Sequence, residues 1–358
     1  MSKSYDAIVV GGGHNGLTCA AYLAKAGRRV LVLERRYLVG GAAVSEEKFP
    51  GFKYTVCSYV VSLLRPEVIR ELELAKHGLQ IVPLDTAWVP MENGDQLAMY
   101  ADPASQRAEV QRHSKRDAEM IPKYNQMMYQ MVGAVKPILG YVPPNPAKPG
   151  LRGLRTLAEF GRHLQSLDKK TFQQLSKIMT MSADDFLAEW VETDVIRALM
   201  GINGIIGTKL GVKSPGTAYV LLHHYMGELD GAFTAWGCQK GGTGGVSEAI
   251  ASAARSHGAE IRVEAPVAKV IVKNGRAVGV ALEDGEEIHA PTVVSGADPR
   301  VTFRKLVDAK ELPSELVDAI DRFKFRGSSG KVNLALDALP IFPAMHDPAL
   351  IRGSIEIS

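Results

Sequence analysis

The chain is 358 residues long, which at roughly 150 residues per domain predicts about two domains. Its 42 Lys and Arg residues against 39 Asp and Glu residues leave a net charge of +3, which argues against a nucleic-acid-binding protein. Apolar residues make up 46% of the chain, as in ordinary globular proteins, and no apolar run is long enough to predict a membrane-spanning helix. The 35 glycines indicate many tight turns and close backbone approaches.

The cysteines and the N-terminus bear on the cellular compartment. Cys19, Cys57 and Cys238 form no C-x-x-C pair. The sequence therefore predicts neither a redox disulfide nor a structural zinc site, and no other cluster predicts a metal. Residues 5–10 already form a predicted strand, and no signal or transit pattern precedes them. We expect a reducing compartment, with the cytoplasm as the default.

The first 34 residues have the pattern of a βαβ unit. Residues 5–10 are a short apolar run ended by glycines, which is typical of a buried parallel strand. Residues 15–26 predict a helix of small and apolar side chains that Gly27 ends, and residues 28–34 predict a second strand. In such a unit, nucleotides bind at the turn between the first strand and the helix.

That turn is Gly11-Gly12-Gly13-His14-Asn15-Gly16, which has the spacing G-x-G-x-x-G. In this pattern Gly11 permits the tight turn, Gly13 lets a pyrophosphate approach the backbone, and Gly16 lets helix and strand pack closely. The helix N-terminus offers free N–H groups and a positive partial charge to the phosphates. Glu34, at the end of the second strand, can accept hydrogen bonds from a ribose diol. This context predicts a bound dinucleotide rather than an ordinary glycine-rich turn.

The residues after the acid distinguish FAD from NAD. Glu34-Arg35-Arg36 is followed by Gly40-Gly41, a second glycine turn that a plain NAD domain does not need. This stretch resembles the FAD-binding signature of the amine oxidase and phytoene desaturase superfamily. The resemblance implies that FAD is the cofactor, that Glu34 binds the adenosine ribose, that Arg36, beside Arg35, lies along the ADP portion, and that Gly40-Gly41 pass the pyrophosphate. Where the family usually continues with Arg, this chain has Ala42, so one familiar phosphate contact is absent.

The second half of the chain resembles the same superfamily. Residues 241–250 begin with a glycine-rich stretch and, together with 258–261 and Val267, are similar to the segment that returns to the FAD domain. The resemblance implies that the backbone at Val267 binds the adenine. The glycines at 241–245 raise the alternative of a separate NAD(P) site, but they lack the third glycine and no clear strand precedes them. We therefore predict no separate NAD(P) domain.

These segments predict an α/β protein with a discontinuous FAD/NAD(P)-binding Rossmann-like domain of the glutathione reductase and amine oxidase type. The predicted divisions are 1–78 and 236–300 for the two parts of the FAD-binding domain, 79–235 for an inserted mixed, mostly helical substrate or cap domain, and 301–358 for the start of a second substrate-domain segment. Residues 331–336 alternate as a strand, and 352–358 resemble another strand without a turn or cap. We interpret the chain as incomplete and expect it to retain FAD poorly.

Inside the insert, local signals predict several helices. Ser182 and Asp185 have the spacing of a capping box before a helix at 183–200. Residues 152–170 place leucines at helical spacing among Arg and Lys side chains. Such a basic amphipathic helix either makes peripheral contact with a membrane or covers the substrate domain. His223-His224 is either a packed histidine pair or an acid/base facing the flavin.

Residues 40–47, 50–54 and 58–66 resemble FAD-dependent oxidoreductases related to phytoene desaturases and carotenoid isomerases. The resemblance implies hydride transfer from a C–H bond of an apolar or lipid-like substrate to flavin N5, in a cleft between domains, with no catalytic side chain that can be named. The alternatives are a flavin-dependent isomerase and a non-catalytic FAD-fold protein with a binding or regulatory role. An animal relative placed in the mitochondrial matrix makes that compartment the alternative to the cytoplasm, and the oligomeric state stays open.

Overall fold

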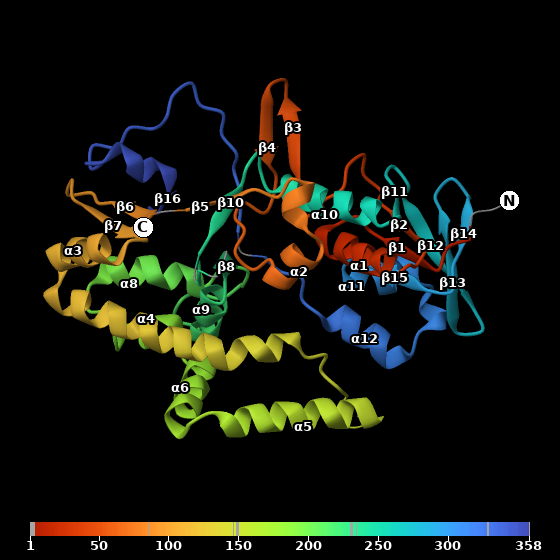
Figure 1. Ribbon diagram of the computed structural model, residues 1–358, viewed down its shortest axis with the longest axis horizontal. Coiled ribbons are helices and arrows are strands. Elements are labelled where there is room, and N and C mark those ends of the chain that lie inside the picture. Colours follow the sequence, from red (N-terminus) through yellow and green to blue (C-terminus); the bar gives the residue numbers. More distant parts are fainter. Residues whose placement is uncertain are drawn as a thin grey trace. The chain divides into compact units, whose positions relative to one another are not determined.

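The chain divides into two compact units (Figure 1). The computed structural model describes residues 4–84, 86–145, 147, 150–229, 232–233, 235–327 and 329–357. Unit 1 consists of Met1–Val82, Gly237–Arg326 and Lys331–Ala335, and unit 2 consists of Pro83–Trp236, Gly327–Gly330 and Leu336–Ser358. Each unit has a hydrophobic core of its own.

Unit 1 combines a parallel sheet with helices and small antiparallel sheets. Its strands are β1 (Ala7–Val10), β2 (Val30–Leu33), β3 (Ser45–Phe49), β4 (Phe52–Thr55), β5 (Ile81–Pro83, which ends at the unit boundary), β10 (Gly237–Gln239), β11 (Glu260–Arg262), β12 (Val267–Lys273), β13 (Arg276–Leu282), β14 (Glu287–His289) and β15 (Val293–Ser295). Its helices are α1 (His14–Lys25), α2 (Pro66–Glu71), α10 (Gly244–Ser256), α11 (Pro299–Val301) and α12 (Ser314–Arg322).

The parallel sheet joins the N-terminal βαβ unit to two strands, β11 and β15, that follow the insert. Its strand order is β11-β2-β1-β15. β1 pairs in parallel with β2, with Ile8 opposite Leu31, and with β15, with Ile8 opposite Val293. β11 pairs in parallel with the outer side of β2. The strands that follow residue 236 thus flank the βαβ unit of the N-terminus, which makes the domain discontinuous in sequence.

Both faces of this sheet are covered. Successive side chains of a strand point to opposite faces. Val9 and Val32 pack against α1 and α10, which lie side by side on one face (Figure 1). Ile8 and Leu31 pack against β12, β13 and β14 on the other face. Because neither face meets water, β1 and β2 are uninterrupted apolar runs rather than alternating ones.

Unit 2 is mostly helical. Its strands are β6 (Thr86–Pro90), β7 (Gln96–Tyr100), β8 (Glu228–Leu229), β9 (Ala232–Phe233) and β16 (Ser354–Ile355). Its helices are α3 (Pro103–His113), α4 (Lys115–Val135), α5 (Gly150–Ser166), α6 (Lys169–Thr180), α7 (Ala183–Ala188), α8 (Asp194–Gly201) and α9 (Thr217–Tyr225). The rings of Phe186, Trp190 and Tyr225 surround the fully buried Tyr124 in its core, with ring centroids 5.8–6.2 Å away.

The unit boundaries differ from the predicted divisions at several places, among them Trp236, which belongs to unit 2, and residues 331–335, which belong to unit 1. Residues 79–82 belong to unit 1 rather than to the insert, because β5 pairs with β10 and the backbone N–H of Gln80 donates to Gln239 Oε1 at 2.9 Å. Residues 301–326 also belong to unit 1, where Leu306 packs in the core between the parallel sheet and the β12–β14 sheet. The predicted boundary at 300 is therefore too early.

The predicted single helix at 183–200 is wrong, because a distant carboxylate interrupts it. α7 ends at Ala188 and α8 begins at Asp194. Between them, the backbone N–H groups of Glu192 and Thr193 donate to the buried carboxylate of Asp117 at 2.9 and 3.0 Å. The predicted cap at Ser182 is present, since its Oγ accepts from the N–H of Asp185 at 3.1 Å.

Three further local predictions differ from the structure in whole or in part. The amphipathic stretch 152–170 is not one helix, because Asp168 accepts the N–H of Thr171 at 3.0 Å and begins α6. Residues 331–336 form no strand, because no strand of the described chain pairs with them. Lys331 instead donates to the carbonyl of Thr55 at 2.6 Å. Of the described part of the predicted strand 352–358, residues 352–357, only β16 is a strand, parallel to β6.

We predict that Gly16→Ala destabilises the fold, whereas Gly133→Ala, in an exposed part of α4, does not. A Cβ at Gly16 would lie 2.2 Å from the carbonyl oxygen of Gly11, which is backbone and cannot move aside, whereas a Cβ at Gly133 meets nothing within 4 Å. The free energy of unfolding, from urea titration, should fall by about 1–3 kcal/mol for Gly16→Ala. It should rise by about 0.5–1 kcal/mol for Gly133→Ala. Equal stability of the two variants would contradict the close packing of α1 on β1.

Candidate cofactor site

The glycine turn between β1 and α1 is held by backbone hydrogen bonds. The N–H of Gly11 donates to the carbonyl of Leu33 at 2.8 Å, and Gly11 has a φ of +98°, a conformation that favours glycine. Gly13 is the extended N-cap of α1 and provides no side-chain cap. His14 and Asn15 are exposed in the first turn of α1. The N-terminus of α1 therefore presents backbone N–H groups to solvent, as an anion-binding site requires.

The second glycine pair lies against this turn. The N–H of Gly40 donates to the carbonyl of Gly12 at 2.8 Å. A Cβ at Gly41 would lie 3.1 Å from Cα of Gly13, so these two segments of the backbone approach too closely for most side chains. Gly40 and Gly41 have φ values of +132° and +59°, both in the range that favours glycine. Two turns that are far apart in the sequence thus form one backbone surface without side chains, which fits a pyrophosphate.

Glu34 is buried beside the turn, with 7% of its surface exposed. Its Oε2 accepts the N–H of Gly12 at 2.7 Å, and its Oε1 accepts the N–H of Arg36 at 2.9 Å. Each carboxylate oxygen has two acceptor positions, so one on each oxygen is left for a further donor such as a ribose hydroxyl. The free acceptor positions of Glu34 and the glycine surface together fit the ribose and pyrophosphate of a dinucleotide.

The guanidinium of Arg36 is held by an acid that the sequence analysis did not single out. Arg36 Nη2 lies 2.5 Å from Oε1 of Glu46 on β3, whose side chain is only 1% exposed. Oε2 of Glu46 also accepts from Lys48 at 2.7 Å and from the hydroxyl of Tyr37 at 3.0 Å. These donors lower the pKa of Glu46 to about 2. Arg35, by contrast, is exposed.

Val267 lies at the start of β12, close in the fold to the acid. The carbonyls of Glu34 and Arg36 accept the N–H groups of Ala265 and Glu264, both at 2.9 Å. Val267 follows two residues later and pairs with Leu282 of β13. The structure thus brings together the turn 11–16, the acid, the glycine pair and the strand of Val267. Their roles toward a cofactor stay predictions.

The second glycine-rich segment, residues 241–245, leads into a helix N-terminus that side chains already cap. The N–H of Gly244, at the start of α10, donates to Ser45 Oγ at 3.0 Å, and the N–H of Thr243 donates to Thr55 Oγ1 at 3.2 Å. Hydroxyls of the β3–β4 hairpin therefore cap α10, whereas α1 has no such cap. A short strand, β10, does precede these glycines, contrary to the prediction, but it pairs with β5 in a separate sheet. Of the two adjacent helices, α1 is the one that fits a phosphate.

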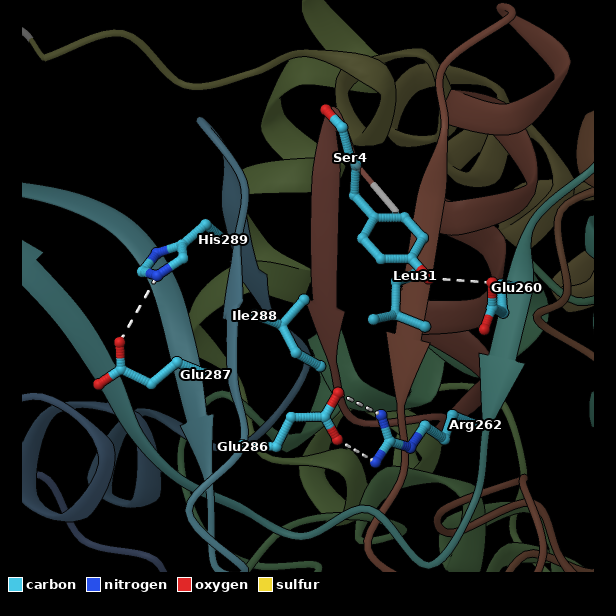
Figure 2. A pocket seen from close by; sticks show the side chains of 9 residues that line it. Ser4, Leu31, Glu260, Arg262, Glu286, Glu287, Ile288 and His289 are labelled. Atoms are coloured by element: carbon cyan, nitrogen blue, oxygen red, sulfur yellow. Dashed lines mark hydrogen bonds and ion pairs between the residues drawn. The ribbon is translucent and has the colours of Figure 1, made fainter. Parts of the chain in front are cut away.

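A hollow of about 460 Å³ lies at the other end of the parallel sheet (Figure 2). Tyr5 precedes β1 and Glu260 begins β11, so the hollow is at the amino ends of the strands, whereas the glycine turn is at their carboxyl ends. Its charged groups bind one another. Arg262 pairs with both carboxylate oxygens of Glu286, and Tyr5 donates to Glu260 at 2.9 Å. The positive charge of Arg262 is therefore already paired and does not offer a binding site for a phosphate. The hollow is not the candidate cofactor site.

The histidine pair lies in unit 2. His224 is buried, its Nδ1 lies 2.9 Å from the carbonyl oxygen of Val220, and its ring centroid is 5.8 Å from that of Trp236. Burial lowers the pKa of His223. His224 thus matches the interpretation of a packed, hydrogen-bonded histidine. No group of three or more His, Cys, Asp or Glu side chains within the described residues is arranged to hold a metal ion.

A parallel sheet with an uncapped glycine turn at its carboxyl edge defines a dinucleotide-binding α/β protein. The chain belongs to the flavin containing amine oxidoreductase family, whose pattern matches residues 16–343. The predicted fold class and the resemblance to this superfamily are thereby confirmed. The family is one of flavin-containing oxidoreductases, which supports an oxidoreductase function.

Individual relatives extend this result. Pyridine nucleotide-disulfide oxidoreductase domain-containing protein 2 of Rattus norvegicus is 38% identical over 363 residues, a match that covers 96% of this chain and 62% of the relative. One of the subunits of limonene dehydrogenase from Castellaniella defragrans is 27% identical, a match that covers 87% of this chain and 55% of the relative. A solved structure of a putrescine oxidase triple mutant has a TM-score of 0.56 at 18% identity, covering 89% of this chain and 63% of that chain, which shows the shared fold. The chain thus spans less than two thirds of the length of these proteins.

We predict that acid weakens the fold through Glu46. Because the pKa of Glu46 in the folded chain, about 2, lies below its ordinary value of 4.5, the ionised form stabilises the fold at neutral pH, and this contribution is lost as the pH falls from about 4.5 to about 2. Glu46→Gln should lower the free energy of unfolding by about 1.5–3 kcal/mol at neutral pH. The difference from wild type should shrink toward pH 2 in urea titrations. A difference that is independent of pH would contradict the ionised network.

We predict that Glu34→Gln weakens FAD binding. The amide nitrogen that replaces one oxygen can only donate, so it faces the N–H of Gly12 or of Arg36 without forming a bond. The affinity for added FAD, measured by quenching of flavin fluorescence, should fall on the order of ten- to a hundredfold. The exposed Glu264, on the neighbouring segment, provides a matched control, and Glu264→Gln should bind FAD like wild type. Unchanged affinity of Glu34→Gln would remove Glu34 from the site.

Proposed function

We propose that this chain is part of an FAD-dependent oxidoreductase that removes a hydride from a C–H bond of an apolar substrate. The observation that carries the proposal is the joint surface of the two glycine turns, with the uncapped N-terminus of α1 on one side and the buried Glu34 on the other. The N–H groups of α1 would donate to the pyrophosphate, the side-chain-free glycine backbone would let it approach closely, and Glu34 would accept from the ribose of a flavin dinucleotide.

Each part of the site would have a defined task. The backbone N–H groups of the first turn of α1 would bind the pyrophosphate, and the dipole of α1 would stabilise its charge. Glu34 would accept from the adenosine ribose, and Arg36, fixed by Glu46, would neutralise charge along the ADP portion. The backbone at Val267 would bind the adenine. FAD, when bound, would supply a two-electron acceptor for the hydride of the C–H bond, and loss of a proton from the neighbouring substrate carbon would leave a C=C double bond in the product.

The apolar substrate class is supported by one of the relatives. The limonene dehydrogenase of Castellaniella defragrans takes its name from a hydrocarbon, which offers C–H bonds but no amine. For hydride removal from a C–H bond next to an alkene, the protein mainly orients the substrate and excludes water, and no titrating side chain is required. This agrees with a cofactor site in which the carboxylate of Glu46 is already bound by Arg36, Lys48 and Tyr37.

The proposal is tested by anaerobic reduction of the flavin. The chain is purified, supplemented with FAD and mixed with limonene as an apolar probe or putrescine as an amine probe, while absorbance near 450 nm is followed. We expect limonene to bleach the flavin and putrescine to leave it unchanged. Dithionite provides the control for full reduction, and Glu34→Gln provides the control for weak cofactor binding.

The other outcomes each contradict the proposal in a different way. Bleaching by putrescine alone would assign an amine as the substrate. A rearranged terpene with unchanged absorbance would identify a flavin-dependent isomerase. Bound flavin that dithionite reduces but no organic probe reduces would favour a non-catalytic protein that binds FAD.

A further inference from the structure

Helix α5 makes few contacts with the rest of unit 2. Of its 17 residues, Gly153 alone is buried. The ring nitrogen Nε2 of His163 lies 2.7 Å from the carbonyl oxygen of Ala134, at the end of α4. Phe160 and Leu164, which are half-buried, follow Gly153 at helical spacing and mark the side that faces the unit. In Figure 1, α5 lies along the lower edge of the picture and is joined to α6.

The apolar surface of α5 is wider than the side that faces the unit. Leu151, Leu154 and Leu157 are 89%, 54% and 39% exposed. They lie three residues apart, so they form one stripe along neighbouring turns of the helix. A monomeric protein rarely exposes such a stripe unless it contacts a partner or a membrane.

The same helix and its continuation are strongly basic. Residues 150–180 contain six Lys and Arg side chains and two carboxylates, those of Glu159 and Asp168. Glu159 pairs with Arg155 at 2.9 Å, and Asp168 caps α6. Arg152 and Arg162 are exposed, and neither forms an ion pair with a carboxylate of the described residues. The leucine stripe is therefore bordered by positive charge that the described carboxylates of the unit do not neutralise.

We propose that α5 docks on the surface of an anionic lipid bilayer. Leu151, Leu154 and Leu157 would enter the boundary between headgroups and acyl chains, and the neighbouring arginines would bind lipid phosphates. A bilayer meets both requirements at once, since it offers apolar depth and negative charge along one plane. A second copy of the chain fits less well, because two α5 helices packed about a twofold axis would bring their arginines together. The contact is peripheral, since no helix in the described ranges is long and apolar enough to cross a membrane.

The test is co-flotation of the chain with lipid vesicles. Vesicles of phosphatidylcholine alone are compared with vesicles that also contain phosphatidylglycerol, at low and at high NaCl concentration. We expect the chain to float with the anionic vesicles only, and salt to weaken the binding. Leu151→Ser with Leu154→Ser should lower the partition coefficient at least about tenfold. Arg152→Gln with Arg162→Gln should lower it by a similar factor.

A matched control uses an exposed leucine and an exposed arginine elsewhere in unit 2. Leu210→Ser with Arg107→Gln changes the same residue types away from α5 and should bind like wild type. Circular dichroism at each variant's working temperature confirms that the exposed substitutions leave the fold intact. The flotation needs no flavin and no substrate, so its result is independent of the proposed oxidoreductase activity.

Three results would overturn the membrane proposal. The first is equal binding to neutral and anionic vesicles, or binding to neither. The second is anionic binding that the α5 variants and the control variant lose equally. The third is a dimer in size-exclusion chromatography that Leu151→Ser with Leu154→Ser converts to a monomer, because the leucines would then be covered by a second copy.

Discussion

Glu34 connects three segments of unit 1 that meet at the edge of the parallel sheet, two through its carboxylate and the third through its backbone carbonyl. A carboxylate with 7% exposure is costly to bury unless hydrogen-bond donors compensate for the lost water. The N–H groups of Gly12 and Arg36 provide that compensation, while the backbone carbonyl of Glu34 holds Ala265 of the returning chain. The glycine turn, the end of β2 and the approach to β12 are therefore fixed relative to one another before any cofactor arrives. A site that is preorganised in this way spends less binding energy on ordering its own backbone.

The β3–β4 hairpin makes the N-termini of α1 and α10 differ, because it caps only that of α10. Ser45 and Thr55 satisfy the N-terminal region of α10, and Ser247 of α10 donates in turn to the carbonyl of Ala43 at 2.8 Å. The same hairpin carries Glu46, which holds Arg36. The β3–β4 hairpin thus caps the N-terminus of α10 and also holds the guanidinium of Arg36, near Glu34 in the candidate site that includes the N-terminus of α1. This explains why two glycine-rich segments of similar composition lead to one candidate phosphate site.

Several parts of this arrangement could be predicted because their physical causes are local. An apolar run, a glycine turn and an acid at the next strand end define β1, α1 and β2 within 34 residues, and the resemblance to the flavoprotein superfamily identified the glycine pair and Val267. The contacts of Glu46 and Asp117 could not be predicted in the same way. Asp117 interrupts a helix 75 residues away, and Glu46 looks like any charged residue in a run of Glu and Lys. Their roles depend on burial, and nothing in the neighbouring residues encodes it.

The sequence by itself determined the fold class, the position of the dinucleotide turn and the acid beside it, since periodicity and glycine spacing act over a few residues. It also showed that 152–170 is basic and amphipathic, but it left open whether the leucines are covered. Only the tertiary structure showed that leucines of this stretch are exposed. It also decided that the N-terminus of α10 is capped, that residues 301–326 belong to unit 1, and that Glu46 binds Arg36. Each of these outcomes depends on contacts beyond the neighbouring residues, from the ten positions between Arg36 and Glu46 to much longer separations, and their free energy appears only when the whole unit packs.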